Sequence, residues 1–276
     1  MTVADIDFAY QCTSLEGWAA ETKETFAAFL AFNPAGCFVA QKNDKRIGIC
    51  IATKYRNSGF IGDLVITREM RGHGYGRQLF DHAVRYLQEQ GITSISLDAD
   101  EPAVALYENF GFRKITRSLR FTGKVRGRKN RFIHQVKPAD LKHICESDTI
   151  LFGEDRGFFL NRRYQKFPDY FYAFKENDHI LGYISGCPGN DIIAVGPLVL
   201  FSEKADPSFL LKGLAAATGD VALRCGVLEN NQQAVSFFRA VTDLEEKTFC
   251  WRMVQGESDI VGFNDKIYAI GSAAKG

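Results

Sequence analysis

The feature that most constrains this chain is a mainly apolar segment, Asp63-Leu64-Val65-Ile66, followed by a turn that holds Gly72, Gly74 and Gly76. Glycine lacks a Cβ, so its backbone can turn tightly and approach a ligand closely. The helical pattern that begins in this turn would place unpaired N–H groups and the positive end of a helix dipole beside it. Those groups suit a phosphate, and Arg71 adds a cation that can form two hydrogen bonds to phosphate oxygens. The sequence therefore predicts a strand, an anion-binding loop and a helix in succession.

The spacing of these glycines separates the loop from two other phosphate-binding classes. Gly72, Gly74 and Gly76 follow a Gly-x-Gly-x-Gly pattern, whereas a dinucleotide-binding turn has Gly-x-Gly-x-x-Gly. No Gly-Lys-Ser or Gly-Lys-Thr follows, which excludes a Walker-type loop. A glycine-rich turn that binds no ligand is the plain alternative.

A second motif lies downstream at Asp100-x-x-Ala103-x-x-Leu106-Tyr107-x-x-x-Gly111-Phe112. Pro102 suits the first turn of a short helix there. Together with the Arg-x-x-Gly-x-Gly of residues 71–76, this motif makes residues 36–112 resemble the GNAT superfamily of N-acetyltransferases. The resemblance implies that the loop binds the pyrophosphate of acetyl-CoA, which serves as the acyl donor.

The resemblance also implies which residues bind the cofactor. The backbone of Leu64, Val65 and Ile66 would pair with the pantetheine arm as an added strand does. The other implied cofactor-binding residues are Arg71, Gly72, His73, Gly74, Tyr75, Gly76, Arg77 and Asp100. An acceptor amine would attack the held acyl carbonyl directly, so most of the rate would come from positioning and carbonyl polarisation. We expect no metal.

Tyr107 matches the tyrosine that hydrogen-bonds the thioester sulfur in this family. A phenol at that place can supply the proton that a departing thiolate needs, although a tyrosine that only packs is the alternative. The family usually has Asn where this chain has Asp100. Asp can cap the following helix, but it would bring a negative charge near the pantetheine arm. Asp63 is the nearest acidic residue in sequence to serve as a base, and the base stays unassigned.

These motifs do not identify the acceptor or the acyl group. We expect an amine on a small molecule or a peptide. A CoA-binding sensor or scaffold would keep the loop without turnover, and a transferase that uses succinyl- or propionyl-CoA would have the same loop.

The second half of the chain repeats the first at an offset of 134 residues. Both halves contain an Asn-Asp turn between apolar strands, an arrangement typical of a β-hairpin. The pairs that share the offset are Asp44 and Asp178, Gly48 and Gly182, and residues 64–66 and 198–200. The same framework of strands is therefore predicted twice.

The second copy has lost the loop. Arg71, Gly72, Gly74 and Gly76 correspond to Ala205, Asp206, Ser208 and Leu210. In Asn231-x-x-Ala234-x-x-Phe237-Phe238, the tyrosine position holds a phenylalanine that has no proton to give. With Phe152-Gly153-Glu154-Asp155-Arg156 and residues 193–198, this half resembles the C-terminal part of a tandem GNAT family, in degenerate form.

The remaining elements follow from periodicity. Ile6, Phe8, Tyr10 and Cys12 alternate with small or polar residues, which predicts a first strand, and residues 13–16 have capping-box spacing that can start a helix. The apolar face of that helix would hold Trp18, Phe26, Phe29 and Leu30. In the resembling family this region covers the acceptor side, so Trp18 is a candidate substrate contact or a core residue. Three antiparallel strands would then lead to the loop, and residues 266–270 would form a closing strand.

We therefore predict an α/β fold of two tandem GNAT-like domains, each a mixed, mostly antiparallel sheet flanked by helices. Residues 1–125 would bind acetyl-CoA and residues 132–276 would form the degenerate domain. Residues 123–131 contain five basic residues and are predicted to be a solvated linker or strand end between the domains, with residues 126–131 as the linker. A contact of this run with an acidic partner or a CoA phosphate is the alternative.

Bulk properties agree with a globular protein that has a sizeable core. The 276 residues are 46% hydrophobic, and they contain no apolar run long enough for a membrane span and no recognisable signal peptide. The net charge of +1 gives no general attraction to nucleic acid. Seven scattered cysteines without metal-ligand spacing indicate reduced thiols and a cytoplasmic protein, with a catalytic cysteine as the alternative. The oligomeric state is not predicted.

Overall fold

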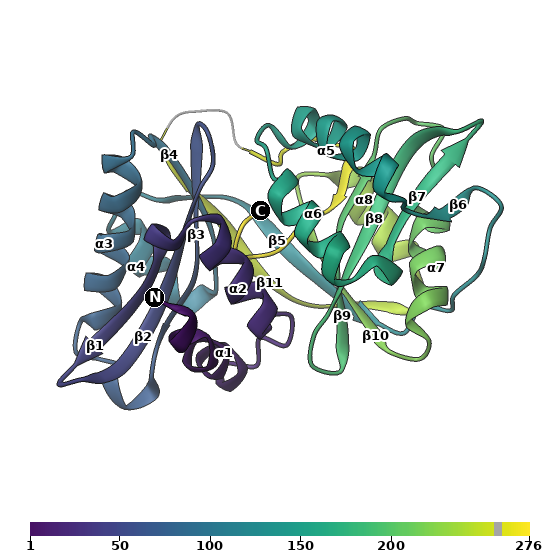
Figure 1. Ribbon diagram of the computed structural model, residues 1–276. Coiled ribbons are helices and arrows are strands. Elements are labelled where there is room, and N and C mark those ends of the chain that lie inside the picture. The colour runs from purple at the N-terminus through teal and green to yellow at the C-terminus, as the bar shows by residue number, and fades with distance from the viewer. Residues whose placement is uncertain (257–260) are drawn as a thin grey trace. The chain divides into compact units, whose positions relative to one another are not determined.

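The computed structural model describes residues 1–256 and 261–276, and these form two compact units (Figure 1). The first unit contains Met1–Ile115, the described part of Trp251–Ile260, and Ala273–Lys275. The second contains Thr116–Cys250, Val261–Ser272 and Gly276. Among the described residues, no helix combines the length and hydropathy that a membrane span requires.

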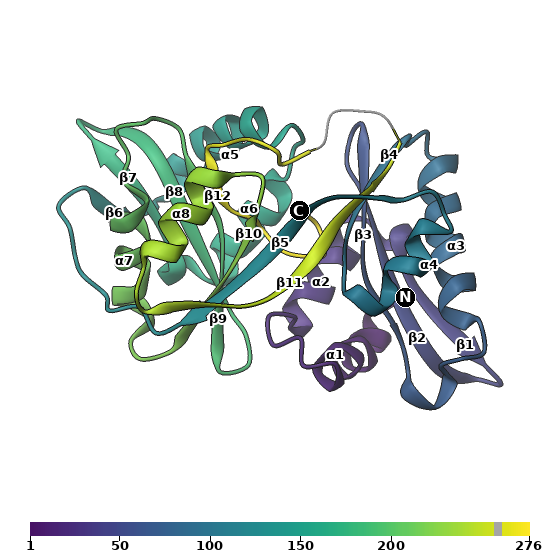
Figure 2. The ribbon, with the colours of Figure 1, turned by 180° about the vertical axis from the view of Figure 1, so that it is seen from behind.

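The first unit is a mixed sheet with helices on both faces. Helices α1 and α2 cover one face, and α3 and α4 cover the other (Figures 1 and 2). The strand order is β1-β2-β3-β4-β11, in which only the β3–β4 pair is parallel. The elements are α1 Ile6–Leu15, α2 Lys23–Phe32, β1 Cys37–Lys42, β2 Lys45–Lys54, β3 Ser58–Ile66, α3 Tyr75–Glu89, β4 Ser94–Ala99 and α4 Val104–Glu108.

The second unit has the same plan. Its strand order is β11-β5-β10-β9-β8-β7-β6, and β12 also pairs with β9. Helices α5 and α6 lie on one face and α7 and α8 on the other (Figure 2). The elements are β5 Arg113–Gly123, β6 Ile133–Gln135, α5 Pro138–Phe152, α6 Gly157–Lys166, β7 Phe171–Glu176, β8 His179–Pro188, β9 Ile192–Leu200, α7 Pro207–Thr218, β10 Ala222–Leu228, α8 Gln232–Ala240, β11 Leu244–Gln255 and β12 Ile267–Ala269.

The predicted internal repeat is confirmed residue by residue. Strands β7, β8 and β9 begin and end 134 residues after β1, β2 and β3, and α6 follows α2 at the same offset. The turns between the first two strands of each copy are Asn43-Asp44 and Asn177-Asp178. Their φ angles are 47° and 62° in the first copy and 48° and 63° in the second, as a two-residue hairpin turn requires. The predicted tandem α/β fold and the closing strand β12 are confirmed as well.

The predicted first strand is wrong, because residues 6–15 form helix α1. The residues that α1 buries, Ala9, Cys12 and Thr13, follow helical rather than alternating spacing. The helix expected to start near Thr13 is also wrong: the Thr13 hydroxyl donates to Tyr10 O at 3.1 Å inside α1, and the next helix, α2, begins at Lys23. Thr22 caps α2 in place of the predicted residues, and Phe26 and Phe29 are buried as expected.

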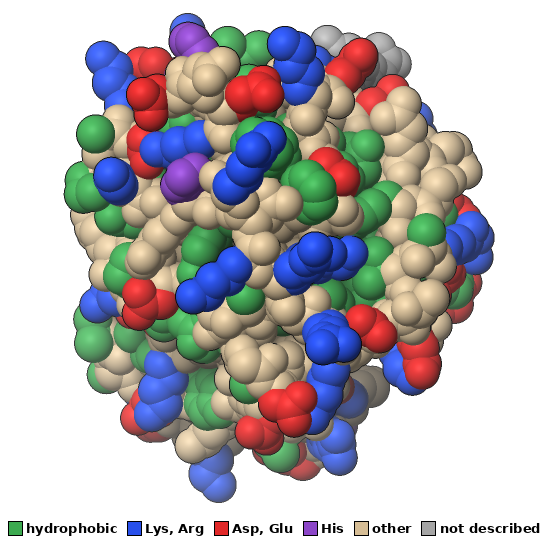
Figure 3. All heavy atoms as spheres, turned by 90° about the vertical axis from the view of Figure 1, so that its right-hand side faces the viewer, with side chains coloured by type: hydrophobic (Ala, Val, Ile, Leu, Met, Phe, Trp, Pro, Cys, Tyr) green, Lys and Arg blue, Asp and Glu red, His purple; other side chains and the backbone are tan. Residues whose placement is uncertain are grey.

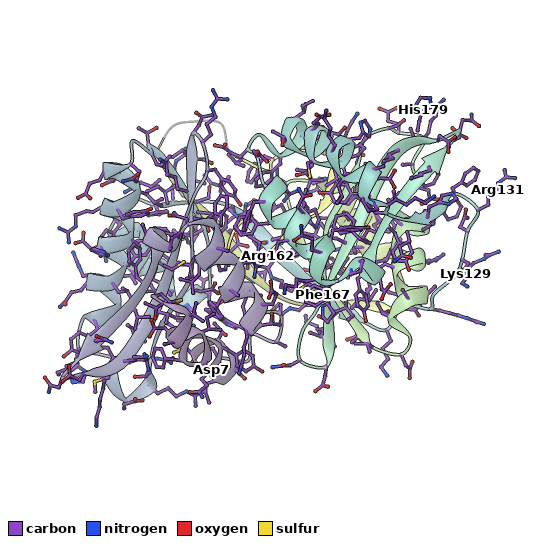
Figure 4. All side chains as sticks on the ribbon, in the orientation of Figure 1. Asp7, Lys129, Arg131, Arg162, Phe167 and His179 are labelled. Carbon is purple, nitrogen blue, oxygen red and sulfur yellow. The ribbon has the colours of Figure 1, made fainter. Side chains whose placement is uncertain are left out.

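The basic run is not a linker between the units. Residues 123–131 lie within the second unit, where Val125 is a buried core residue and the Arg128 N–H donates to Lys212 O of α7 at 3.0 Å. The cationic side chains are solvated as predicted, and Lys129 and Arg131 point outward (Figure 4). The face in Figure 3 shows Lys and Arg side chains spread among acidic ones.

Two strands carry the chain from one unit to the other. Strand β5 leaves the first unit after Ile115, and β11 enters it at Trp251. The last part of β11 pairs antiparallel with β4, from Trp251 opposite Ala99 to Gln255 opposite Ile95. The predicted domains, residues 1–125 and 132–276, miss this exchange of strands. The pairing of β11 with β4 joins residues far apart in sequence, and no local pattern predicts it.

Candidate active site

Strands β3 and β4 diverge halfway along the first sheet. They pair only through residues 58–60 and 94–96, although β3 continues to Ile66. A register shift between Ile49 and Ile51 of β2 opposes the same region of β3. Within the part of the chain that the structure describes, no strand pairs with residues 64–66 on the side toward β4. We call this backbone the open edge.

The glycine loop follows the open edge directly. Gly72 and Gly74 both have φ = 79°, a conformation that side chains rarely adopt, and a Cβ on either would meet nothing within 4 Å. Gly74 is the N-cap of α3. A Cβ on Gly76 would lie 3.5 Å from the Ile66 side chain, which shows that the helix start lies close to the end of the open edge. Unpaired helix N–H groups and an unpaired strand edge therefore occur side by side.

Arg71 links the loop to the end of β3 and to the residue that follows α1. Its Nε donates to Ile66 O at 2.9 Å, and its Nη2 donates to Glu16 Oε1 at 2.6 Å. Arg68 adds a hydrogen bond from Nη2 to Leu15 O at 2.9 Å. The guanidinium expected to contact phosphate thus also holds the C-terminal end of α1 next to the loop. Glu16 was not predicted, because no local pattern links it to Arg71.

Three other loop residues have aromatic partners. His73 and Tyr75 stack with ring centroids 5.9 Å apart, and Lys42 Nζ lies 5.1 Å above the Tyr75 ring. Arg77 lies 5.5 Å from the Phe110 ring, which follows α4. Lys42 comes from the end of β1 and was missed by sequence reasoning. These contacts place several cationic side chains around the loop.

Tyr107 lies on α4 within an aromatic cluster. Its ring is 4.8 Å from Phe80 of α3 and 6.4 Å from Phe112, and the residue is buried. Asp100 is the N-cap of the short 3-10 turn before α4, where its backbone carbonyl accepts from the Ala103 N–H at 2.9 Å. The capping role open to an Asp at this position is not used, because the Asp100 side chain forms no capping hydrogen bond to this turn.

Asp63 lies where the strands diverge and has three unusual properties. Its φ is 51°, it is buried, and its Oδ2 atom has no hydrogen-bond partner. Burial, followed by the nearby charge of Glu21, raises the pKa of Asp63 well above its ordinary value, and the Lys275 ammonium opposes the shift. Strain and an unsatisfied buried carboxylate are typical of functional sites.

Glu21 and Lys275 form a charged cluster with Asp63. Both are buried. Tyr55 Oη donates to Lys275 O at 2.7 Å, and Lys275 Nζ lies 4.8 Å from the Phe29 ring centroid. A Cβ on Gly62 would be 2.6 Å from Ala274 Cα, so residues 273–275 pack closely against β3. Sequence reasoning missed both residues, because Lys275 is distant in sequence and Glu21 lies outside any motif.

The turn between α1 and α2 passes close to the cluster. Trp18 is half-buried there, and its carbonyl accepts from the Glu21 N–H at 3.0 Å. All seven cysteines are free thiols, and burial raises the pKa of Cys37 to about 12 and that of Cys12 to about 11. Those two groups are therefore protonated at neutral pH and poor nucleophiles.

The second copy has replaced these features. Asp206 Oδ1 accepts from the Ser208 N–H at 2.7 Å, so a carboxylate caps the start of α7. Pro197 takes the position of Asp63, and the fully buried Phe238 takes that of Tyr107. This copy has neither the loop nor the acidic residue of the first.

Comparison with known proteins gives the same picture. The Acetyltransferase (GNAT) family model matches residues 4–112, and an Acetyltransferase (GNAT) domain model matches residues 144–269. The chain is 30% identical over 100 residues to N-alpha-acetyltransferase MAK3 of Arabidopsis thaliana, covering 34% of this chain and 53% of that protein. It is 31% identical over 108 residues to N-alpha-acetyltransferase 30 of Schizosaccharomyces pombe, covering 36% and 72%.

The structural comparison extends over the whole chain. A putative acetyltransferase from Pyrococcus horikoshii superposes with a TM-score of 0.82 at 23% identity, covering 100% of this chain and 94% of that one. The chain spans about half the length of the first curated relatives that it matches. Both halves have a GNAT fold, and the chain belongs to the GNAT acetyltransferase family, in its tandem form.

Proposed function

We propose that this protein is an N-acetyltransferase that binds acetyl-CoA in its first copy and transfers the acetyl group directly to an amine. The observation that carries the proposal is the meeting of the open edge with the glycine loop at Ile66. An extended arm can add to an open strand edge, and the start of α3 can receive a phosphate. Gly72 and Gly74 leave room for close approach.

The residues present fit this ligand. Backbone groups of residues 64–66 would hold the pantetheine arm, and the N–H groups of residues 72–76 would hold the pyrophosphate. Lys42 and Arg77 lie near the loop and add positive charge. Acetyl-CoA supplies an activated acyl group that an amine can attack.

Two side chains would carry out the proton transfers of the reaction. Tyr107 would supply a proton from its hydroxyl to the departing thiolate. Asp63 would accept a proton from the acceptor ammonium, directly or through water. Its raised pKa brings this carboxylate closer to the range in which a general base is effective. Glu21 would help to stabilise the positive charge of the acceptor ammonium, because it lies close enough to Asp63 to raise the pKa of that carboxyl.

We further propose a peptide α-amino group as the first acceptor to test, because the curated relatives are named as N-alpha-acetyltransferases. A small-molecule amine and a longer acyl-CoA are the alternatives. The free thiols are typical of a reducing compartment, and we propose a cytoplasmic location.

Calorimetry with acetyl-CoA tests the binding site. We expect one site per chain, and Gly74→Asp should abolish binding because it places a carboxylate in the loop. Gly91→Asp is the matched control: Gly91 also has positive φ with open space around it, but it lies beyond the other end of α3. Equal binding by wild type and Gly74→Asp would refute the assignment of the loop.

Turnover separates an enzyme from a CoA-binding sensor. Release of free CoA thiol should be followed with a panel of peptides that differ at the first residue and with small amines. An enzyme releases thiol in proportion to acetylated acceptor. Tight binding of acetyl-CoA without release for any acceptor would favour the sensor.

A further inference from the structure

The second copy contains the same divergence of strands as the first. Strand β9 pairs in parallel with β10 only through residues 192–195, although it continues to Leu200. Its partner β8 has a register shift between Ile184 and Gly186. At the offset of 134, these features correspond within one residue to the divergence of β3 and β4 and to the shift in β2. The second copy therefore has the counterpart of the open edge at residues 198–200.

A strand of the same chain occupies that edge. In β12, Ile267 pairs with Val199 and Ala269 with Leu198. The Leu200 N–H donates to Lys266 O at 2.9 Å, and the Ile270 N–H donates to Gly226 O of β10 at 2.9 Å. Residues 265–270 thus bind β9 and β10 where those strands no longer pair with each other (Figure 2).

Asn231 also binds this segment through its side chain. Its Nδ2 donates to Asp265 O at 2.9 Å and to Ile267 O at 3.0 Å, and its Oδ1 accepts from the Ala234 N–H at 3.0 Å. The residue is buried, and it holds the motif position that Asp100 holds in the first copy. An amide can donate to two carbonyl groups, whereas a carboxylate cannot donate at all.

Apolar contacts hold the segment as well. Ile267, Ala269 and Ile270 are all buried, and the Tyr268 ring lies 5.8 Å from Phe237 of α8. The segment therefore contacts its site through strand hydrogen bonds, a dedicated side-chain amide and buried side chains. This combination is the one by which protein domains bind an extended peptide at a strand edge.

We infer that the second copy has kept its ligand-binding edge as a strand-binding site, and that its resident ligand is this chain's own segment 265–270. The description of that edge as the counterpart of an acyl-CoA site rests on the proposed function, whereas the binding of a strand at that edge is independent of the proposed function. While the segment is in place, Leu198 and Val199 are unavailable to any other extended ligand.

Displacement of the strand and its replacement by a peptide test the inference. Ile267→Asp with Ala269→Asp puts two charges at buried positions of β12 in the full chain. A synthetic peptide with the sequence of residues 264–271, Asn-Asp-Lys-Ile-Tyr-Ala-Ile-Gly, is the probe. By calorimetry it should bind the double variant one to one, and at least tenfold more tightly than a peptide that carries the same two Asp residues. Wild type should not bind it, because the site is occupied.

The matched control places the same charges elsewhere. Lys247→Asp with Phe249→Asp has the same spacing on exposed positions of β11, and this variant should not bind the peptide. Failure of the folded Ile267→Asp, Ala269→Asp variant to bind, or equal binding by wild type, would overturn the inference.

If the double variant does not fold by itself, its refolding in the presence of the peptide provides a second measurement. The wild-type peptide should restore protection of the Leu200 amide against hydrogen exchange, and the Asp-bearing peptide should not. Absence of rescue would also overturn the inference. Neither readout uses acyl-CoA or turnover, so a chain that never bound acetyl-CoA would refute the proposed function and leave this result standing.

Discussion

Asp63 combines a positive φ with burial and an oxygen that lacks a hydrogen-bond partner. Backbone strain of this kind costs about 1–3 kcal/mol and persists only where the surroundings enforce it. A buried carboxylate with a raised pKa adds a further cost when it is ionised. Strain and a perturbed carboxylate of this kind cluster at functional sites, which is why we propose the proton-accepting role for Asp63.

Asp63→Asn should therefore lower turnover while it raises stability. Asn tolerates positive φ and removes the buried charge. We expect kcat to fall by about 10²–10⁴-fold, the usual contribution of general base catalysis, and Tm to rise at neutral pH. Turnover and thermal unfolding measured on one preparation test both. A variant that lost stability and kept full turnover would exclude the role.

The pH dependence follows from the direction of the Asp63 pKa shift. The folded protein keeps this proton to a higher pH than the unfolded chain does. The stability that Asp63 contributes is therefore present below its unfolded pKa and is lost as pH rises through the folded pKa. The Tm advantage of Asp63→Asn should grow across the same window, and wild-type activity should rise across it as the carboxylate ionises.

Tyr107→Phe removes one hydroxyl from an aromatic cluster that keeps its shape. If Tyr107 protonates the thiolate, turnover should fall by about 10²–10⁴-fold and the Kd for acetyl-CoA should stay the same. Tyr164→Phe on α6 is the control for the substitution itself. An unchanged single-turnover rate would show that Tyr107 only packs.

Asp100→Asn tests what the second copy suggests about the first. Asn231 donates to two carbonyl groups of an extended segment, and Asp100 cannot donate. Restoring the amide and removing a negative charge should lower the Kd for acetyl-CoA by about tenfold, close to what one added hydrogen bond contributes. Calorimetry measures the Kd, and an unchanged affinity would show that residue 100 has no pantetheine contact.

At the scale of elements, sequence reasoning succeeded where pattern is local. Turn chemistry and periodicity predict the hairpins, β3, the glycine loop and α3, and the offset of 134 predicts the corresponding strands of the second copy. Sequence reasoning failed at α1, because the apolar residues of 6–12 alternate by chance, whereas the residues that α1 buries have helical spacing. It could not find β11 beside β4, or Glu21 and Lys275 beside Asp63, because those contacts join distant segments.

The β4–β11 pair contains a buried ion pair whose loss should be costly. Arg252 Nε lies 2.5 Å from Asp98 Oδ1, and both side chains are almost fully buried. Arg252→Met removes the cation beside a buried carboxylate, which should lower the free energy of unfolding by about 3–5 kcal/mol. Asp98→Leu added to Arg252→Met should recover most of the loss.

Denaturant unfolding measures both variants. Arg85→Met is the control, because Arg85 forms an exposed pair with Asp81 in the same unit, and exposed pairs contribute little. A cost for Arg252→Met no larger than that of Arg85→Met would mean that β11 is held without the ion pair.

At the scale of the whole molecule, neither unit is a continuous segment, because each is assembled from three separate stretches of the chain. Residues 1–125 contain the loop and the open edge but lack the strand beside β4 and the Lys275 tail. Expressed alone, they should not give a cooperative unfolding transition or bind acetyl-CoA. Co-expression with residues 126–276 should restore both. A fragment 1–125 that folded and bound acetyl-CoA alone would show that β11 is dispensable.

The crossing of β11 also has a consequence during synthesis on the ribosome. Strand β4 is complete at Ala99, but its partner begins at Trp251, about 150 residues later. At about 5–20 residues per second, the nascent chain would carry an unpaired strand edge for roughly 8–30 seconds. Such an edge can pair with other chains, so this protein should rely on chaperones for the first unit until the last strands emerge, and slow translation near its C-terminal end should favour aggregation.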